Sequence, residues 1–136
     1  MTATFLLIFL ATKAQTSDSS KAKEISTDSI YKNLDVEASF PGGEKAWNEY
    51  VMKGIAKKFE KIAKDKASNG TCEVQFVIDT DGSIINVEAI TMKNSVLAKF
   101  FIEIVRNGEK WQPGLKNGRP AKVYRRQKVT FSVPDF

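Results

Sequence analysis

Histidine, the side chain most often used for proton transfer near neutral pH, does not occur in the 136-residue chain. This excludes Ser-His and Cys-His catalysis as well as histidine-ligated zinc sites. Cysteine occurs once, at Cys72, so the chain forms neither an internal disulfide nor a cysteine-ligated metal cluster. Because Cys72 falls within an alternating strand pattern, we expect a small buried side chain rather than a reactive thiol.

Two carboxylates lie close together in the segment Asp79-Thr80-Asp81-Gly82, which resembles the start of a calcium loop. The EF-hand pattern needs glycine at its sixth position and glutamate at its twelfth. Counted from Asp79, Gly82 is fourth and Ile90 is twelfth, and the flanking patterns are those of strands. The segment is therefore interpreted as a hairpin turn. At a solvated hairpin tip we expect little change in the pKa of either carboxylate, and so no acid-base pair.

No other motif supplies the parts of a catalytic or cofactor site. Gly42-Gly43 has no strand pattern before it and no Gly-Lys-Ser or Gly-Lys-Thr after it, so it is interpreted as a turn leading into a helix. No serine lies in a nucleophile-elbow context, and no base is present to activate one. We expect a non-enzymatic protein with no catalytic residue, no cofactor and no metal site.

A basic aromatic segment near the C-terminus has the residue types of a binding surface. Lys122 and its basic neighbours flank Tyr124, and such a strand could touch a phosphate backbone or an anionic cell-wall polymer. A polar, lysine-bearing strand also protects an exposed sheet edge, and an exposed edge can accept an extended peptide as an additional strand. The candidate partner-binding residues are Tyr124, Arg125, Arg126, Gln127, Lys128 and Val129.

The overall charge does not indicate a nucleic-acid partner. The chain has 21 Lys and Arg against 16 Asp and Glu, a net charge of +5 that is spread along the sequence. A dedicated nucleic-acid domain usually shows a stronger and more clustered excess. We expect a slightly basic, solvated surface and a protein or peptide partner.

Helical periodicity appears in two regions. After the turn Phe40-Pro41-Gly42-Gly43, apolar residues recur at helical spacing and predict a short helix near 44–52. A second helical stretch follows and ends at Asn69-Gly70, residues that tolerate a left-handed cap. Further along, Asn94 or Ser95 can cap a helix with a wide apolar stripe. The members of that stripe are Val96, Leu97, Phe100, Phe101, Ile104 and Val105.

Three strands are predicted, and they define the fold class. Residues 72–78 and 84–90 alternate on either side of the Asp-Gly turn, and a last strand runs over about 121–133. Amphipathic helices must cover the apolar face of such a sheet. The prediction is an α+β two-layer sandwich, with a three-stranded antiparallel sheet packed against two or more helices. The core candidates are Trp47, Phe76, Phe100, Ile104, Trp111 and Phe131.

The N-terminal region has a different composition. Residues 4–11 form an apolar run that is too short to span a bilayer as a helix, and small residues follow it. This pattern predicts a signal peptide over residues 1–15, cleaved near Ala14 or Gln15, although no Lys or Arg precedes the apolar run. Residues 16–35 are rich in polar residues and predict a flexible lead-in. The folded domain is expected over residues 36–136.

The order of six short motifs resembles the C-terminal domain of TonB, over about residues 36–133. No single motif is specific, but their order and spacing together follow the family. The motifs are Phe40-Pro41-Gly42-Gly43-Glu44, Gly70-Thr71, Phe76-Val77-Ile78-Asp79 with Asp81-Gly82, Trp111-Gln112-Pro113-Gly114, Asn117-Gly118-Arg119-Pro120 and Val129-Thr130-Phe131.

The resemblance implies a periplasmic domain of double-membrane bacteria. In that family the domain binds the TonB box, a segment of outer-membrane transporters that adds as a strand beside the domain's last strand. In this chain the strand-addition edge would be Tyr124–Phe131, bordered by the segment Phe59–Gly70. The resemblance thus implies a non-enzymatic partner of TonB-dependent transporters.

Departures from the family leave three hypotheses open. An energy transducer has an N-terminal membrane helix and a proline-rich spacer, and this sequence shows neither. The first hypothesis is a secreted TonB-like domain that binds peptides or proteins by strand addition. The second is a complete transducer whose start has been misplaced, so that its membrane helix lies upstream. The third is a structural or cell-wall-binding module. An exposed edge also allows self-pairing into a homodimer.

Overall fold

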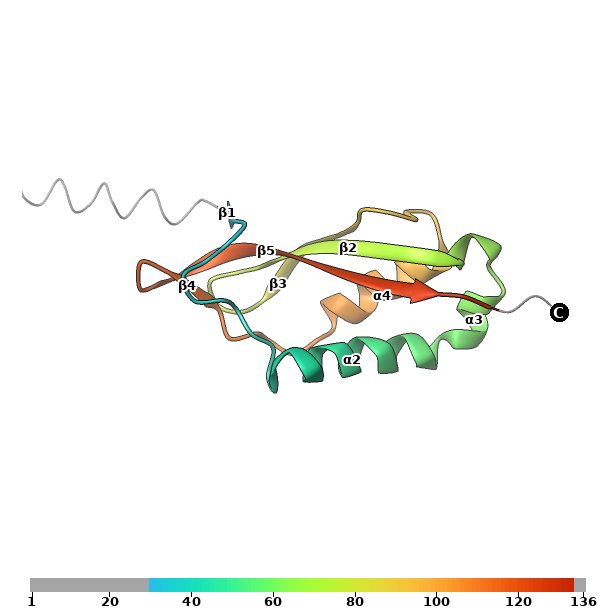
Figure 1. The fold of residues 1–136 in the computed structure, drawn as a ribbon, viewed down its shortest axis with the longest axis horizontal. Helices are drawn as coiled ribbons and strands as arrows, with labels where there is room; N and C mark the ends of the chain where they lie inside the picture. The colour runs from blue at the N-terminus through green and yellow to red at the C-terminus, as the bar shows by residue number, and fades with distance from the viewer. Residues whose placement is uncertain (1–29, 134–136) are drawn as a thin grey trace, which may run out of the picture.

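The computed structural model describes residues 30–133, and the predicted signal peptide over 1–15 lies outside them. Figure 1 shows the order of the elements along the chain. The strands are β1 (Ile30–Tyr31), β2 (Gly70–Ile78), β3 (Ile84–Ala89), β4 (Gly114–Lys116) and β5 (Arg119–Phe131). The helices are α2 (Gly43–Lys57), α3 (Phe59–Ala63) and α4 (Val96–Arg106), with a 3-10 turn at Lys66–Ser68.

The predicted two-layer α+β architecture is confirmed. β2 pairs antiparallel with β3 and β5, as predicted, and all three helices lie on one face of this sheet (Figure 1). Two short strands extend the predicted three. β1 pairs parallel with β5, and β4 forms a hairpin with β5, so the sheet is mixed and has five strands in the order β1-β5-β2-β3 with β4 beside β5.

Helix α2 begins at the predicted Pro-Gly turn. The N–H of Gly43 donates to the carbonyl of Phe40 at 2.7 Å, and Gly42 has a positive φ of 91° that favours glycine. The helix is longer than the predicted 44–52 and continues through Gly54. A Cβ at Gly54 would lie 2.8 Å from the side chain of Ile104, so this glycine allows α2 and α4 to pack closely.

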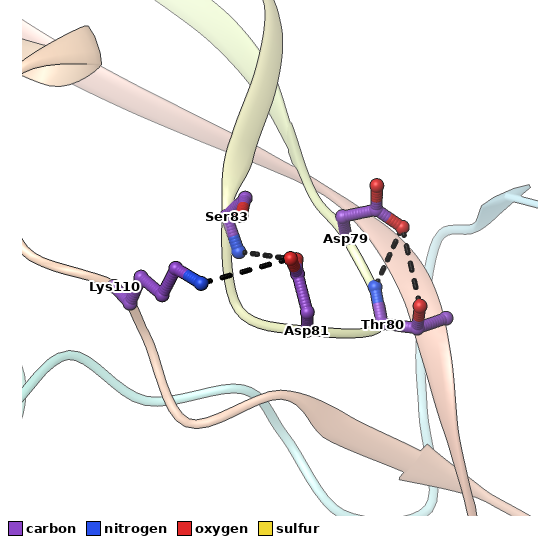
Figure 2. A network of polar contacts seen from close by, with 5 residues as sticks. All are labelled: Asp79, Thr80, Asp81, Ser83 and Lys110. Atoms are coloured by element: carbon purple, nitrogen blue, oxygen red, sulfur yellow. Dashed lines mark hydrogen bonds and ion pairs between the residues drawn. The ribbon is translucent and has the colours of Figure 1, made fainter.

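The hairpin between β2 and β3 forms as predicted, and its tip is shown in Figure 2. The N–H of Gly82 donates to the Asp79 carbonyl at 2.9 Å. The expectation of a nearly unchanged pKa is wrong for Asp81. The Ser83 N–H donates to the Asp81 carboxylate at 2.9 Å and lowers its pKa, and Lys110 Nζ, 3.8 Å away, acts in the same direction.

Helix α4 is held at its N-terminus by two sets of side chains. Ser95 is the N-cap, one of the two predicted candidates, and its Oγ accepts from the Ala98 N–H at 3.0 Å. Asp65, from the turn before β2, adds a second anchor. Its carboxylate accepts from the Val96 N–H at 2.8 Å and from the Ser68 hydroxyl at 2.7 Å. The 3-10 turn and α4 are therefore joined through Asp65.

We expect Asp65→Asn to lower the melting temperature at pH 7, because both carboxylate oxygens accept hydrogen bonds and an amide nitrogen cannot. The bond from Val96 is the main cause that lowers the pKa of Asp65. A depressed pKa in the folded state stabilises the fold above the unfolded value of about 3.9, and that stability is lost as pH falls through the folded pKa.

Thermal unfolding between pH 2 and pH 7 measures this effect. The gap in melting temperature between the chain and Asp65→Asn should narrow below about pH 4. Glu60→Gln, at an exposed position of α3, serves as the control and should leave the melting temperature unchanged. A gap that stays constant down to pH 2 would show that the Asp65 charge does not stabilise the fold.

The core lies between the sheet and the helices and is built around aromatic rings. Trp47 and Phe76 are fully buried, and Trp111 and Phe131 are 3% and 7% exposed, as predicted. Phe100 and Ile104 are only partly buried and pack against this cluster. Cys72 is buried as expected, and burial raises the pKa of its thiol.

The folded domain begins earlier in the chain than residue 36. Ile30 and Tyr31 pair with Lys122 and Val123 of β5, and Leu34 is 8% exposed in the core. The predicted flexible lead-in is therefore wrong for residues 30–35, and its remaining part, 16–29, lies outside the described residues. A two-residue strand that pairs with a segment about ninety residues away leaves no periodic pattern in the sequence.

Candidate functional site

The six candidate partner-binding residues lie consecutively on β5. Their side chains alternate between the two faces of the sheet, as in any strand. Tyr124, Arg126 and Lys128 are exposed on the outer face, which the helices leave open (Figure 1). Arg125, Gln127 and Val129 point toward the helices and are partly or fully buried.

The helix-facing residues of this set are tied into the fold. The indole N–H of Trp47 donates to the side-chain oxygen of Gln127 at 2.8 Å. Arg125 forms an ion pair with Glu44 of α2, and its guanidinium lies 5.1 Å from the ring centroid of Trp111. These two side chains therefore position β5 over α2, a role that the sequence did not predict.

The outer-face residues are less constrained. Arg126 donates to the side-chain oxygen of Gln75 at 3.0 Å and lies 3.8 Å from the Glu73 carboxylate. Tyr124 is 38% exposed. Lys128 is exposed and makes no ion pair with residues 30–133. Cationic side chains therefore line the outer face along β5.

One edge of β5 is open over most of its length. β1 pairs only with Lys122 and Val123, and β4 only with residues 119–121. Over Tyr124–Phe131, within the described part of the chain, β5 pairs with β2 alone. The predicted strand-addition segment therefore coincides with an unpaired strand edge.

The hydrogen bonds of Glu73 show which groups point toward this edge. The Glu73 carbonyl accepts from the Ile90 N–H at 2.7 Å and its N–H donates to Thr91 Oγ1 at 2.9 Å, both on the β3 side. Glu73 lies opposite Lys128 in an antiparallel ladder, in which opposite residues exchange both backbone bonds or neither. The backbone N–H and C=O of Lys128 therefore point away from β2.

Alternation along the strand extends this result. The register between β2 and β5 is continuous from Gly70↔Phe131 to Ile78↔Val123. Every second residue therefore directs its backbone groups to the same edge. The residues whose N–H and C=O face the open edge are Tyr124, Arg126, Lys128 and Thr130.

Each end of the open edge has its own chemical character. At the start, where β1 leaves β5, lies a pocket of about 520 Å³. It is lined by two neutral polar side chains, Tyr124 and Gln75, and by three cations, Lys32, Arg125 and Arg126. At the other end the ring of Phe59 lies 5.5 Å from that of Phe131 and is 48% exposed. Asn69 Oδ1 accepts from the Val133 N–H at 2.9 Å. The segment Phe59–Gly70 thus lies beside the end of β5.

Lys32 is a site residue that the sequence does not predict. It falls in the predicted flexible lead-in, and only the pairing of β1 with β5 brings it to the edge.

No cluster of three or more potential metal ligands occurs among residues 30–133. No helix in that range is long and apolar enough to cross a membrane.

Comparison with known protein families identifies the family of the chain. The model of the Gram-negative bacterial TonB protein C-terminal domain matches residues 56–133, more than half of the chain, and the chain belongs to this family. TonB C-terminal domains are non-enzymatic interaction domains of the Gram-negative periplasm that act in TonB-dependent transport. Comparisons with curated proteins and with solved structures find no match.

Proposed function

We propose that this chain is a periplasmic domain that binds an extended segment of an outer-membrane transporter, the TonB box, as an additional strand beside β5. The observation that carries the proposal is the open edge at Tyr124–Phe131, where β5 pairs with β2 and with no other strand of the described residues. Membership of the TonB C-terminal family supplies the class of partner. The domain performs no catalysis in this account.

Backbone groups provide most of the affinity in such a complex. Four residues of β5 direct their N–H and C=O toward the edge, and each hydrogen bond contributes about 0.5–1.5 kcal/mol net. The helix-facing contacts of Arg125 and Gln127 hold β5 in place before the partner arrives. A preformed edge reduces the entropy lost on binding.

Two other functions make different predictions. A complete energy transducer would need a membrane helix encoded upstream, so an in-frame apolar segment with a basic flank in the preceding coding sequence would favour it. A cell-wall-binding module would use the cations of the outer face, and its binding would fall steeply with salt. Strand addition depends on backbone bonds and is less sensitive to salt.

The test is an NMR titration of the isotope-labelled chain with TonB-box peptides from transporters of the same genome. We expect chemical-shift changes concentrated on Tyr124–Phe131. A peptide with proline at two successive positions, which removes N–H donors from both of its edges, is the matched control. No shift at millimolar concentrations of any of these peptides would overturn the proposal.

A further inference from the structure

We infer that the segment added beside β5 alternates acidic and apolar residues, with its acidic side chains on the outer face opposite Arg126 and Lys128. This inference rests on the proposed strand addition and specifies the partner's sequence pattern. It follows from the different chemistry of the two faces along the open edge.

Cations outnumber carboxylates on the outer face along β5. Arg126 and Lys128 share one carboxylate, because Glu73 lies 3.8 Å from Arg126 and opposite Lys128 in the register between β2 and β5. Lys32 adds a further cation in the pocket where the edge starts. Side chains directly opposite each other on neighbouring strands lie about 4.5–5.5 Å apart, close enough for an ion pair. Acidic residues of the partner would therefore neutralise this face.

The helix-facing side of the same edge has no free charge to offer. The guanidinium of Arg125 is already paired with Glu44, and Gln127 is neutral and bonded to Trp47. Toward the end of the strand this side becomes apolar, with Val129 and Phe131 buried and Phe59 exposed beside Phe131. Apolar side chains of the partner gain contact area here, whereas charged ones would lose hydration without a counterion.

Self-pairing is disfavoured by the same charges. If two copies paired antiparallel through this edge, a register centred on Gln127 would place Arg126 of one copy opposite Lys128 of the second. Registers centred on Arg126 or Lys128 would place like residues opposite each other. Like charges directly opposite on neighbouring strands are destabilising. A second copy of the chain is therefore a poorer occupant of this edge than an acidic strand.

Three eight-residue peptides with blocked ends test the pattern by NMR titration of the full chain at low salt. The first alternates Glu and Val, the second alternates Gln and Val, and the third has four Glu followed by four Val. We expect the alternating Glu peptide to bind at Tyr124–Thr130 about fivefold more tightly than the Gln peptide, from two cross-strand charge pairs. The block peptide should also bind more weakly, because its acidic residues face both sides.

Substitutions in the chain show which residues cause the preference for the Glu peptide over the Gln peptide. In Arg126→Gln/Lys128→Gln the advantage of the Glu peptide over the Gln peptide should disappear, while binding of the Gln peptide stays the same. Lys99→Gln, an exposed position on α4, changes the net charge without touching β5 and should keep the full advantage.

The outcomes separate this inference from the proposed function. Equal binding of the Glu and Gln peptides at the edge would leave strand addition standing and overturn the acidic pattern. Binding of none of the three peptides, together with no binding of TonB-box peptides, would overturn both. A concentration-dependent dimer with shifts on the same residues would show that a second copy occupies the edge, and would overturn the inference.

Discussion

Lys128→Pro should weaken binding of a TonB-box peptide by about 10- to 100-fold while the domain stays folded. The N–H of Lys128 points to the open edge, so proline there removes a donor that β2 does not use. Proline is tolerated in a strand where its missing N–H would face solvent. In the complex, however, a partner carbonyl loses its donor, which costs about 1–3 kcal/mol.

The neighbouring position supplies the contrast. Val129 directs its N–H toward β2, opposite Cys72 in the register. Val129→Pro should lower the free energy of unfolding by about 3 kcal/mol, because it breaks a ladder bond and leaves a buried acceptor unpaired. Lys128→Gln removes the charge but keeps the N–H, so it separates the backbone effect from the electrostatic one.

Both proline predictions are checked on the three variants Lys128→Pro, Val129→Pro and Lys128→Gln. Calorimetry measures the peptide affinity of each variant, and urea unfolding measures its stability. Our assignment of the open edge would be contradicted if Lys128→Pro unfolds the domain or if Val129→Pro leaves it as stable as the unmodified chain. Either result would mean that the odd and even positions of β5 point the opposite way.

Trp47→Ala should be the most destabilising single substitution in α2, lowering the free energy of unfolding by about 3–5 kcal/mol. Trp47 is fully buried, and its ring centroid lies 5.0 Å from that of Trp111, 5.2 Å from Phe40 and 5.8 Å from Phe76. Removing it leaves a cavity at the centre of the aromatic cluster and frees the side chain of Gln127.

Urea unfolding followed by far-UV circular dichroism measures this loss. Met52→Ala, on the same helix but 53% exposed, is the matched control and should change the stability by less than about 0.5 kcal/mol. If Trp47→Ala lowers the free energy of unfolding by less than about 1 kcal/mol, the aromatic cluster does not make the main contribution to the stability of the core. Such a result would also remove the support that we assign to α2 beneath β5.

The elements predicted correctly are those with local signals. The Asp79–Gly82 hairpin depends on turn residues and period-2 alternation, and the start of α4 depends on the capping serine Ser95. The continuation of α2 beyond residue 52 could not be predicted, since it depends on Gly54 facing Ile104 across the interface with α4. A contact between two helices that lie far apart in the sequence leaves no signal in the local residue pattern.

The candidate site was predicted as a segment but not as a geometry. The basic, polar character of β5 indicated an edge strand, and the structure places Tyr124–Phe131 at an unpaired edge. The inward direction of Arg125 depends on Glu44, 81 positions earlier, and the role of Lys32 depends on β1. Contacts between residues so far apart in sequence cannot be derived from composition or periodicity.

Amide hydrogen exchange along β5, with and without a bound TonB-box peptide, tests strand addition most directly. In the free chain we expect slow exchange at 125, 127 and 129, which face β2, and fast exchange at Tyr124, Arg126 and Lys128. Binding should slow the fast set to rates similar to those of the slow set. Fast exchange that persists at Tyr124, Arg126 and Lys128 in a saturated complex would contradict the proposed function.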